Sequence, residues 1–309
     1  MNPLQIILLG LGGIFLALWA RAPRHPRAAF AFARYTLVGL SSLAVLMPFV
    51  WLLAAIFKDK SVFNEYVFFP PLGEISRRTV NLDNFVELFR GKPSVQGTVH
   101  FWQYILNSTV YASVGTVVQL VFSSAAGYAL AKYEFRGKRQ LMIFMLGSMT
   151  IPGVLLLAPL YKMIVSLGLV DSLAGLLLPG LVNAYGIFLF RQACMTIPNE
   201  MLDAARIDGC SELMIFYRLV MPLVRPMAAA FCLVAFLGHW NAFFGPSIFL
   251  QSADNLTLPV VLNLYVNEYS NDYGVFLAGT ALAMIPPAIL FFTLQREFIS
   301  GLTSGAVKG

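Results

Sequence analysis

The chain has 309 residues, of which 58% are hydrophobic and only 12% are charged. Soluble domains carry about 25% charged residues, so this composition excludes an ordinary water-soluble enzyme and indicates a membrane protein. The net charge of +6 does not indicate a nucleic-acid partner, because the basic residues gather at the ends of apolar segments, where they set membrane topology.

Apolar segments of about 20 residues are long enough to cross a bilayer as helices. The first candidate, residues 3–20, is followed rather than preceded by arginines, which favours a membrane helix over a cleaved signal peptide. Stronger candidates follow at residues 36–57, 104–131, 140–161, 173–190, 227–250 and 274–294. The sequence therefore predicts an all-α membrane protein with six core helices and an extra N-terminal helix.

The distribution of lysine and arginine predicts the orientation. The segments 21–34, 132–139, 191–226 and 295–309 are basic, whereas the short connections on the opposite side contain only Lys162. Basic segments stay in the cytoplasm, so the C-terminus is expected inside. The long segment 58–103 is then an extracytoplasmic loop, with a short helix expected near Leu82–Phe89.

These features divide the chain into five parts. They are an N-terminal helix with a basic linker (1–34), a first core helix (35–57), the extracytoplasmic loop (58–103), a core domain (104–298) with a cytoplasmic loop at 197–222, and a cytoplasmic tail (299–309).

The cytoplasmic loop predicts two short helices separated by a glycine. Pro198 ends the preceding helix, and Asn199 is a favourable N-cap for a helix that runs to Asp208. Gly209 then ends this helix, as glycine often does. A second helix is expected from Ser211 to about Pro222. The small side chains of Ala204 and Ala205 would let the first helix lie close to another surface.

This pattern resembles the EAA loop of permease subunits of binding-protein-dependent ABC importers. The matching residues are Ala204, Ala205, Asp208, Gly209, Phe216 and Pro222. Asp203 stands where the family usually has glutamate, and Cys210 where alanine is common. The tail 295–309, the segment 128–138 and the segment 81–85 are similar to maltose-type carbohydrate permeases, so the resemblance extends from about residue 36 to the C-terminus.

The resemblance implies the type I ABC importer permease fold in the inner membrane of a bacterium. A coupling helix containing Asp203, Ala204, Ala205, Arg206, Asp208 and Gly209, with Phe216 behind it, would contact a dimer of ATPase subunits. Lys308 and Gly309 would reach between those subunits. A second homologous permease, forming a heterodimer, and an extracytoplasmic solute-binding protein at loop 251–272 would complete the importer, surrounded by membrane lipid.

ATP and Mg are expected on the partner ATPase, with no cofactor in this chain. The segment Gly91-Lys92-Pro93-Ser94 is not a phosphate-binding loop, since proline interrupts the required pattern. Three histidines, His25, His100 and His239, are too scattered to predict a metal site. The chain is therefore expected to be a transport subunit, not an enzyme.

Polar side chains inside membrane spans are costly and often functional. Asn183 and Tyr185 lie in one predicted span, and His239, Trp240 and Asn241 lie together in another. Aromatic faces and hydrogen-bonding groups suit a sugar, so these residues are candidates for the substrate path. An equally weighted alternative is that His239 and Asn241 only bind neighbouring helices.

The leading hypothesis is a carbohydrate importer for an oligosaccharide, a glycoside or a polyol. A non-sugar solute such as glycerol phosphate is the first alternative. A membrane-embedded enzyme would need ionisable residues clustered near one membrane face, and an ion-driven carrier usually uses intramembrane acids or paired repeats. The spans provide neither pattern.

Overall fold

The computed structural model describes residues 13–14, 16–17, 20, 26–70, 72–94, 97–267 and 273–306. The chain divides into two compact units between Leu82 and Asp83, within the predicted outer loop. Most of the predicted N-terminal helix 3–20 lies outside the described residues, and Lys308 and Gly309 also lie outside them.

The first unit contains one long helix followed by an irregular segment. Its elements are α2 (Pro26–Ala55) and the 3-10 helix η1 (Leu72–Glu74). The irregular segment is organised around Lys58, which is only 1% exposed and whose ammonium group donates to the carbonyls of Tyr66 and Val67. Burial lowers the pKa of Lys58. The described part of the loop is therefore folded, although its sequence predicts little regular structure.

The second unit is helical apart from one short hairpin. Its elements are α3 (Asp83–Phe89), β1 (Lys92–Ser94), β2 (Gly97–Val99), α4 (Phe101–Lys132), α5 (Lys138–Ser148), η2 (Gly153–Leu156), α6 (Leu157–Ser166), α7 (Leu173–Leu177), η3 (Leu178–Gly180), α8 (Ala184–Met195), α9 (Asn199–Ile207), α10 (Glu212–Met214), the π-helix η4 (Ile215–Val220), α11 (Met221–Leu223), α12 (Arg225–Trp240), α13 (Phe244–Phe249), η5 (Ala253–Asn255), α14 (Leu258–Asn267), α15 (Tyr273–Ala283) and α16 (Ile285–Ala306). The helix expected near Leu82–Phe89 is confirmed as α3.

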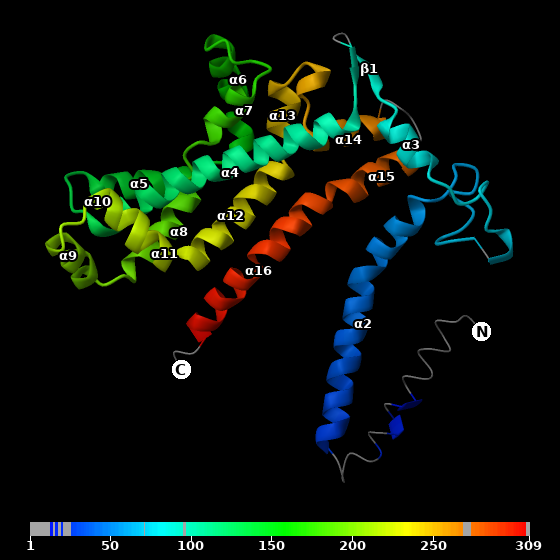
Figure 1. The fold of residues 1–309 in the computed structure, drawn as a ribbon, viewed down its shortest axis with the longest axis horizontal. Coiled ribbons are helices and arrows are strands. Elements are labelled where there is room, and N and C mark those ends of the chain that lie inside the picture. Colours follow the sequence, from blue (N-terminus) through cyan, green and yellow to red (C-terminus); the bar gives the residue numbers. More distant parts are fainter. Residues whose placement is uncertain are drawn as a thin grey trace. The chain divides into compact units, whose positions relative to one another are not determined.

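The 32-residue helix α4 is the centre of this unit. It lies against α8 and α12, and α12 lies in turn against α16. Figure 1 shows α9 and α10 at one end of α4, and the hairpin and α14 at the other. The close approach of α4 and α8 depends on Gly127, because a Cβ there would lie 2.6 Å from the Phe190 Cβ. Small residues at helix contacts allow such close packing in membrane proteins.

Within the described ranges, three helical segments are long and apolar enough to cross a membrane: Phe30–Ala55, Phe101–Lys132 and Tyr273–Glu297. They confirm the predicted spans 36–57, 104–131 and 274–294. Three bent pairs of helices raise the number to six if each pair is one span.

The bends correct two predicted helices. The expected helix 140–161 is bent by 96° between Ser148 and Gly153. Pro152 lies in this break, and a proline lacks the N–H of a helix and disfavours helical backbone in the preceding residue. The expected helix 173–190 is bent by 51° between Gly180 and Ala184, and continues to Met195.

The prediction of one helix over 227–250 is also wrong. Helix α12 ends at Trp240, and α13 begins only at Phe244. A continuous helix would need the N–H of residue 246, which is a proline. At its other end, α12 follows the segment Glu212–Leu223 after a bend of 81°.

Candidate functional site

The predicted two-helix loop is present, and its first helix, α9, has one buried and one exposed face. Pro198, rather than the expected Asn199, is the N-cap, and Gly209 ends the helix with a φ of 78°. Leu202 is only 1% exposed, whereas Ile207 is 86% exposed. The second helix begins as predicted at Ser211, whose Oγ accepts from the Met214 N–H at 3.3 Å.

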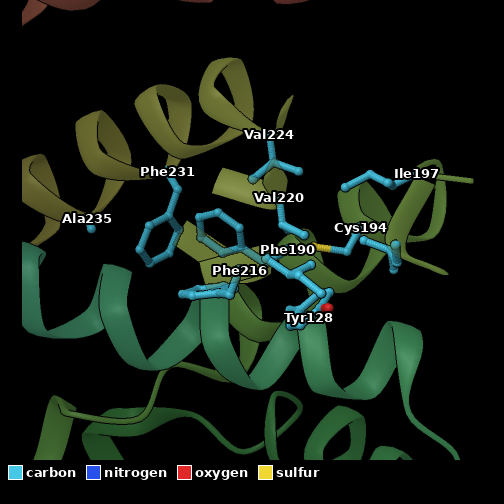
Figure 2. Packing of buried hydrophobic residues seen from close by; sticks show 11 residues of the cluster. Tyr128, Phe190, Cys194, Ile197, Phe216, Val220, Val224, Phe231 and Ala235 are labelled. Carbon is cyan, nitrogen blue, oxygen red and sulfur yellow. The ribbon is translucent and has the colours of Figure 1, made fainter. Parts of the chain in front are cut away.

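The buried face of α9 rests on an apolar cluster, which we call the inner core (Figure 2). Its members come from α4, α8, α9, η4, α12 and adjoining turns: Tyr128, Phe190, Cys194, Ile197, Leu202, Ile215, Phe216, Val220, Val224, Phe231 and Ala235. Phe216 is buried with its ring centroid 5.6 Å from that of Tyr128. The role of Phe216 in the described chain is therefore to support α9 from behind.

The exposed face of α9 carries the other predicted coupling residues. Asp203, Ala204, Arg206 and Asp208 are exposed, whereas Ala205 is half-buried and packs on the inner core. The expectation of two alanines on one smooth outer face therefore holds for Ala204 only.

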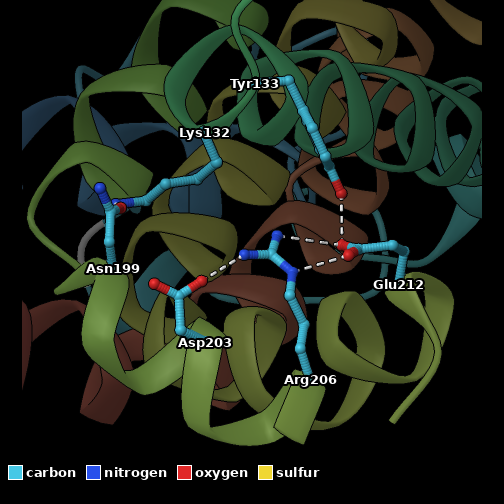
Figure 3. Close-up of polar contacts among 6 residues, drawn as sticks. All are labelled: Lys132, Tyr133, Asn199, Asp203, Arg206 and Glu212. Atoms are coloured by element: carbon cyan, nitrogen blue, oxygen red, sulfur yellow. Dashed lines mark hydrogen bonds and ion pairs between the residues drawn. The ribbon is translucent and has the colours of Figure 1, made fainter. Parts of the chain in front are cut away.

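A polar network fixes the outer side of this loop (Figure 3). The Arg206 guanidinium lies 2.7 Å from the Asp203 carboxylate and 2.8 Å from that of Glu212. The Tyr133 hydroxyl donates to Glu212 at 2.5 Å. The Arg206 bond, and then the Tyr133 bond, lower the pKa of Glu212, while desolvation and the bond to Glu212 raise the pKa of Tyr133.

Lys132 forms a second attachment. Its ammonium group donates to the Ile197 carbonyl and, at 2.9 Å, to the Asn199 Oδ1. The sequence analysis placed Lys132 only in a basic segment that sets the orientation, but its side chain binds the loop that carries α9. This role is invisible in the sequence, because two bent pairs of helices lie between Lys132 and Ile197.

Exposed apolar side chains surround α9 and were missed by the sequence analysis. Ile207, Leu213 and Tyr217 are 86%, 72% and 59% exposed. Ile207 lies on the exposed face of α9 itself and is therefore a candidate contact with another protein. The alternation of the three residues with charged residues in the sequence was the available signal.

The predicted substrate-path residues do not form one cluster of free polar groups. The Asn183 Oδ1 caps α8 by accepting from the Gly186 N–H at 2.9 Å, and its Nδ2 donates to the Gln119 Oε1 at 3.2 Å. Tyr185 is 44% exposed. The bonds of Asn183 therefore tie α4 to the bend that precedes α8.

His239 and Trp240 are both engaged with neighbouring helices. The His239 ring packs edge-on against Tyr111, with centroids 5.0 Å apart, and faces Gly115, where a Cβ would lie 2.8 Å from its Nε2. The Trp240 Nε1 donates to the Ala283 carbonyl at 3.1 Å. Asn241 is exposed, and its side chain donates to the Leu237 carbonyl.

A pocket lies where α12 and α15 end and α14 and α16 begin. Leu237, Trp240 and Asn241 at the end of α12 contribute to it, together with residues from α14, α15, α16 and the α15–α16 connection: Leu258, Pro259, Leu262, Thr280, Ala283, Met284 and Pro287. Its side chains are neutral, and most are apolar. The arrangement suits a neutral molecule with an apolar face better than an anion.

Comparison with known proteins places these features in a family. Residues 119–303 match the family described as "Binding-protein-dependent transport system inner membrane component". The chain is 38% identical over 236 residues to the arabinooligosaccharides transport system permease protein AraQ of Bacillus subtilis, covering 76% of this chain and 82% of that protein. It is 31% identical to the lactose transport system permease protein LacG of Rhizobium radiobacter, covering 89% and 95%.

Solved structures show the same fold. A chain of a bacterial ABC transporter involved in the import of the acidic polysaccharide alginate superposes with a TM-score of 0.74 at 22% identity, covering 89% of this chain and 98% of that one. A chain of the MetNI methionine ABC transporter in an inward-facing conformation matches with a TM-score of 0.50 at 15% identity, covering 70% and 97%.

Proposed function

The chain belongs to the family of binding-protein-dependent transport system inner membrane components, and on that basis we propose that it forms half of the path of a carbohydrate importer. It is a multi-pass inner-membrane permease with the ABC importer permease fold, as the sequence predicted. The family also decides against the membrane-embedded enzyme and the ion-driven carrier.

The proposal that the substrate is a sugar rests on the relatives of this chain. Two of them are named for arabinooligosaccharides and lactose, and another, 30% identical, for melibiose, raffinose and stachyose. The neutral lining of the pocket beside Trp240 and Asn241 supports an uncharged oligosaccharide over glycerol phosphate. The exposed groups Asn241 and Tyr185 are the proposed sugar contacts, with Asn183, His239 and Trp240 holding the path in shape.

The proposed partners are an ATPase dimer, a second homologous permease in a heterodimer, and an extracytoplasmic solute-binding protein. The exposed face of α9, with Asp203, Ala204, Arg206, Asp208 and Ile207, is the proposed contact with the ATPase. ATP and Mg would be bound by that partner. Lys308 and Gly309 remain a proposed second contact between the ATPase subunits.

The proposed orientation places the α9 loop and the C-terminus in the cytoplasm. An ion pair of 2.8 Å between Arg225, at the start of α12, and Glu297, in the second half of α16, supports the same side for both. The arginines of segment 191–226 would then face the cytoplasm, as the distribution of positive charge requires.

The test is expression of the chain with the ATPase, second permease and solute-binding protein of its own organism. We expect the ATPase and second permease to co-purify, and proteoliposomes to import arabinotriose or lactose, but not glycerol 3-phosphate, when ATP is enclosed. Import of glycerol 3-phosphate alone would overturn the assignment to sugars, and purification of this chain alone would overturn the importer.

The coupling role of α9 has a matched test. Gly209→Ala and Gly168→Ala each place a side chain at a positive φ, of 78° and 67°, with no atom within 4 Å of the new Cβ. The backbone cost, about 1–2 kcal/mol, is the same in both. We expect Gly209→Ala to reduce ATP-driven uptake and Gly168→Ala, in the connection between α6 and α7, to leave it near normal. Equal uptake by both variants would contradict the assignment of α9 as the coupling helix.

A further inference from the structure

Two adjacent residues at the end of α4 hold both ends of α9. Lys132, the last residue of α4, binds Ile197 and Asn199 at the start of α9. Tyr133, the C-cap of α4, donates to Glu212, which also binds Arg206 in the last turn of α9. The two attachments are independent, since they use different donors and reach opposite ends of the helix.

The apolar side chains of the inner core fill the space between these two attachments. Leu202 of α9 and Tyr128 of α4 are 1% and 4% exposed and belong to the same apolar cluster. Interiors of this kind are close-packed and transmit displacement instead of absorbing it. A shift of α9 alone would break both polar attachments and expose Leu202, so α9 and the end of α4 are expected to move together.

The opposite part of α4 is attached to the segment between α13 and α14. The Asn107 Nδ2 donates to the carbonyls of Asp254 and Leu256, at 2.7 and 3.0 Å. The Ser108 Oγ accepts from the Leu258 N–H at 2.7 Å in a buried position. Helix α4 is unbroken between Ser108 and Lys132, a distance of about 36 Å at 1.5 Å per residue.

We infer that α4 is the rigid connection between the α9 loop and segment 253–258, and that Tyr133 and Glu212 are positioning residues for this connection. The inference rests on the proposed function, because it assumes that α9 meets an ATPase. The other helices that lead away from the α9 loop are bent, at the break between α7 and α8 and at the break between α11 and α12. A displacement of α9 can be absorbed by a change in the angle at such a break. Helix α4 has none.

The experiment follows segment 253–258 directly and needs no sugar. Asn255, which is exposed, is changed to cysteine in a chain whose own three cysteines are replaced by alanine. The chain is assembled with its ATPase and second permease. Labelling of Asn255→Cys by a membrane-impermeant maleimide is then timed with and without MgATP and vanadate, alongside the rate of ATP hydrolysis.

We expect MgATP and vanadate to change the labelling rate in the parent complex. Tyr133→Phe removes one hydroxyl but keeps the ring, and loss of this hydrogen bond should reduce the ATP-dependent change by about fivefold. ATP hydrolysis and co-purification of the ATPase should persist. Glu212→Gln should act similarly, and the double variant should be no worse than the stronger single one, because both break the same link.

Glu134→Gln is the matched control. It breaks a 2.8 Å ion pair with Lys138 in the same connection between α4 and α5, and removes the same charge as Glu212→Gln. It should keep the full labelling response. The inference is overturned if the parent shows no ATP-dependent change, if Tyr133→Phe responds as the parent does, or if Glu134→Gln loses the response equally. Absence of the ATPase from the purified parent would instead contradict the proposed function.

Discussion

Gly127 controls how closely α4 and α8 pack. Besides the Phe190 Cβ, a side chain at this position would meet the backbone nitrogen of Arg191 at 2.7 Å. A backbone atom in a packed helix cannot move aside as the end of a flexible side chain can. The cost of an added methyl group therefore falls on the crossing of the two helices.

Gly127→Ala is expected to lower stability by about 1–3 kcal/mol, the usual cost of overpacking. The control is Gly147→Ala in α5, where no atom lies within 4 Å of the new Cβ. Thermal unfolding of the detergent-solubilised importer measures both. A stable Gly127→Ala variant would show that the helices are less tightly packed than these distances indicate.

Glu212 gives the α9 loop a pH dependence. Its pKa is lowered from the ordinary 4.5 by Arg206 and Tyr133, so the folded loop favours the charged carboxylate. This contribution to stability is fully present above pH 4.5 and is lost as the pH falls through the lowered pKa.

Hydrogen exchange of residues 197–212 measures this effect. Protection should be constant from neutral pH to about 5 and then decrease below the ordinary glutamate pKa. Glu212→Gln should have weaker protection at neutral pH and little further change on acidification. A parent loop whose protection is independent of pH down to 3 would contradict the role of this carboxylate.

Sequence reasoning at this scale identified residues whose type alone is informative. Gly209 was predicted because a glycine after a short polar helix usually ends it. Tyr133 and Glu212 were not predicted, because tyrosine and glutamate are ordinary residues in cytoplasmic loops and nothing local pairs two positions so far apart. Only the packing of α9 onto α4 brings them together.

At the scale of the helices, the positions of the breaks determine the arrangement of the chain more than the helix lengths do. The bend before α8 is held by Asn183, which caps α8 and binds Gln119, while the Gln119 Nε2 donates to the Gly180 carbonyl at 2.7 Å. One buried glutamine thus satisfies polar groups on both sides of the break. Such groups would otherwise be unsatisfied in an apolar environment.

Asn183→Ala is expected to destabilise this bend by about 1 kcal/mol for the lost cap, and by about 1–3 kcal/mol more for the unpaired Gln119. Asn183→Ser keeps a cap acceptor but is too short to bond Gln119, so it should lose only the second contribution. Denaturation of the purified importer compares the two variants. Equal stability of both would mean that the cap contributes nothing.

The apolar runs of the sequence predicted where helices occur but not where they bend. Composition is similar on both sides of Pro152 and around Pro246, so a hydropathy window joins segments that the backbone separates. Proline was a signal in each case, but Pro48 lies within the continuous helix α2. Whether a proline breaks a helix depends on which neighbours satisfy the freed carbonyl, and the sequence does not contain that information.

At the scale of the whole molecule, the distribution of charge and the position of α9 make one consistent prediction about sidedness. Arg139 lies at the start of α5, and Lys162 lies in α6; both are exposed. The proposed orientation puts them on opposite sides of the membrane.

Single cysteines test this orientation in intact cells. With the native cysteines replaced, Lys162→Cys should react with a membrane-impermeant maleimide added outside, and Arg139→Cys should react only after the membrane is permeabilised. Reaction of Arg139→Cys in intact cells would show that the orientation is opposite to the proposed one and that α9 does not lie in the cytoplasm.

The π-helix Ile215–Val220 has a consequence for register. Its wider turn brings Ile215 and Val220, five residues apart, to the same buried face, where they are 1% and 0% exposed. In an α-helix, each residue advances the chain by about 100°. Five residues of regular α-helix would therefore place Val220 about 140° from Ile215, outside the apolar cluster. Deleting one residue here would leave the two residues four apart in a regular α-helix, about 40° from each other, so Val220 would stay on the buried face. The π turn thus accommodates one additional residue while Ile215 and Val220 keep the same buried face.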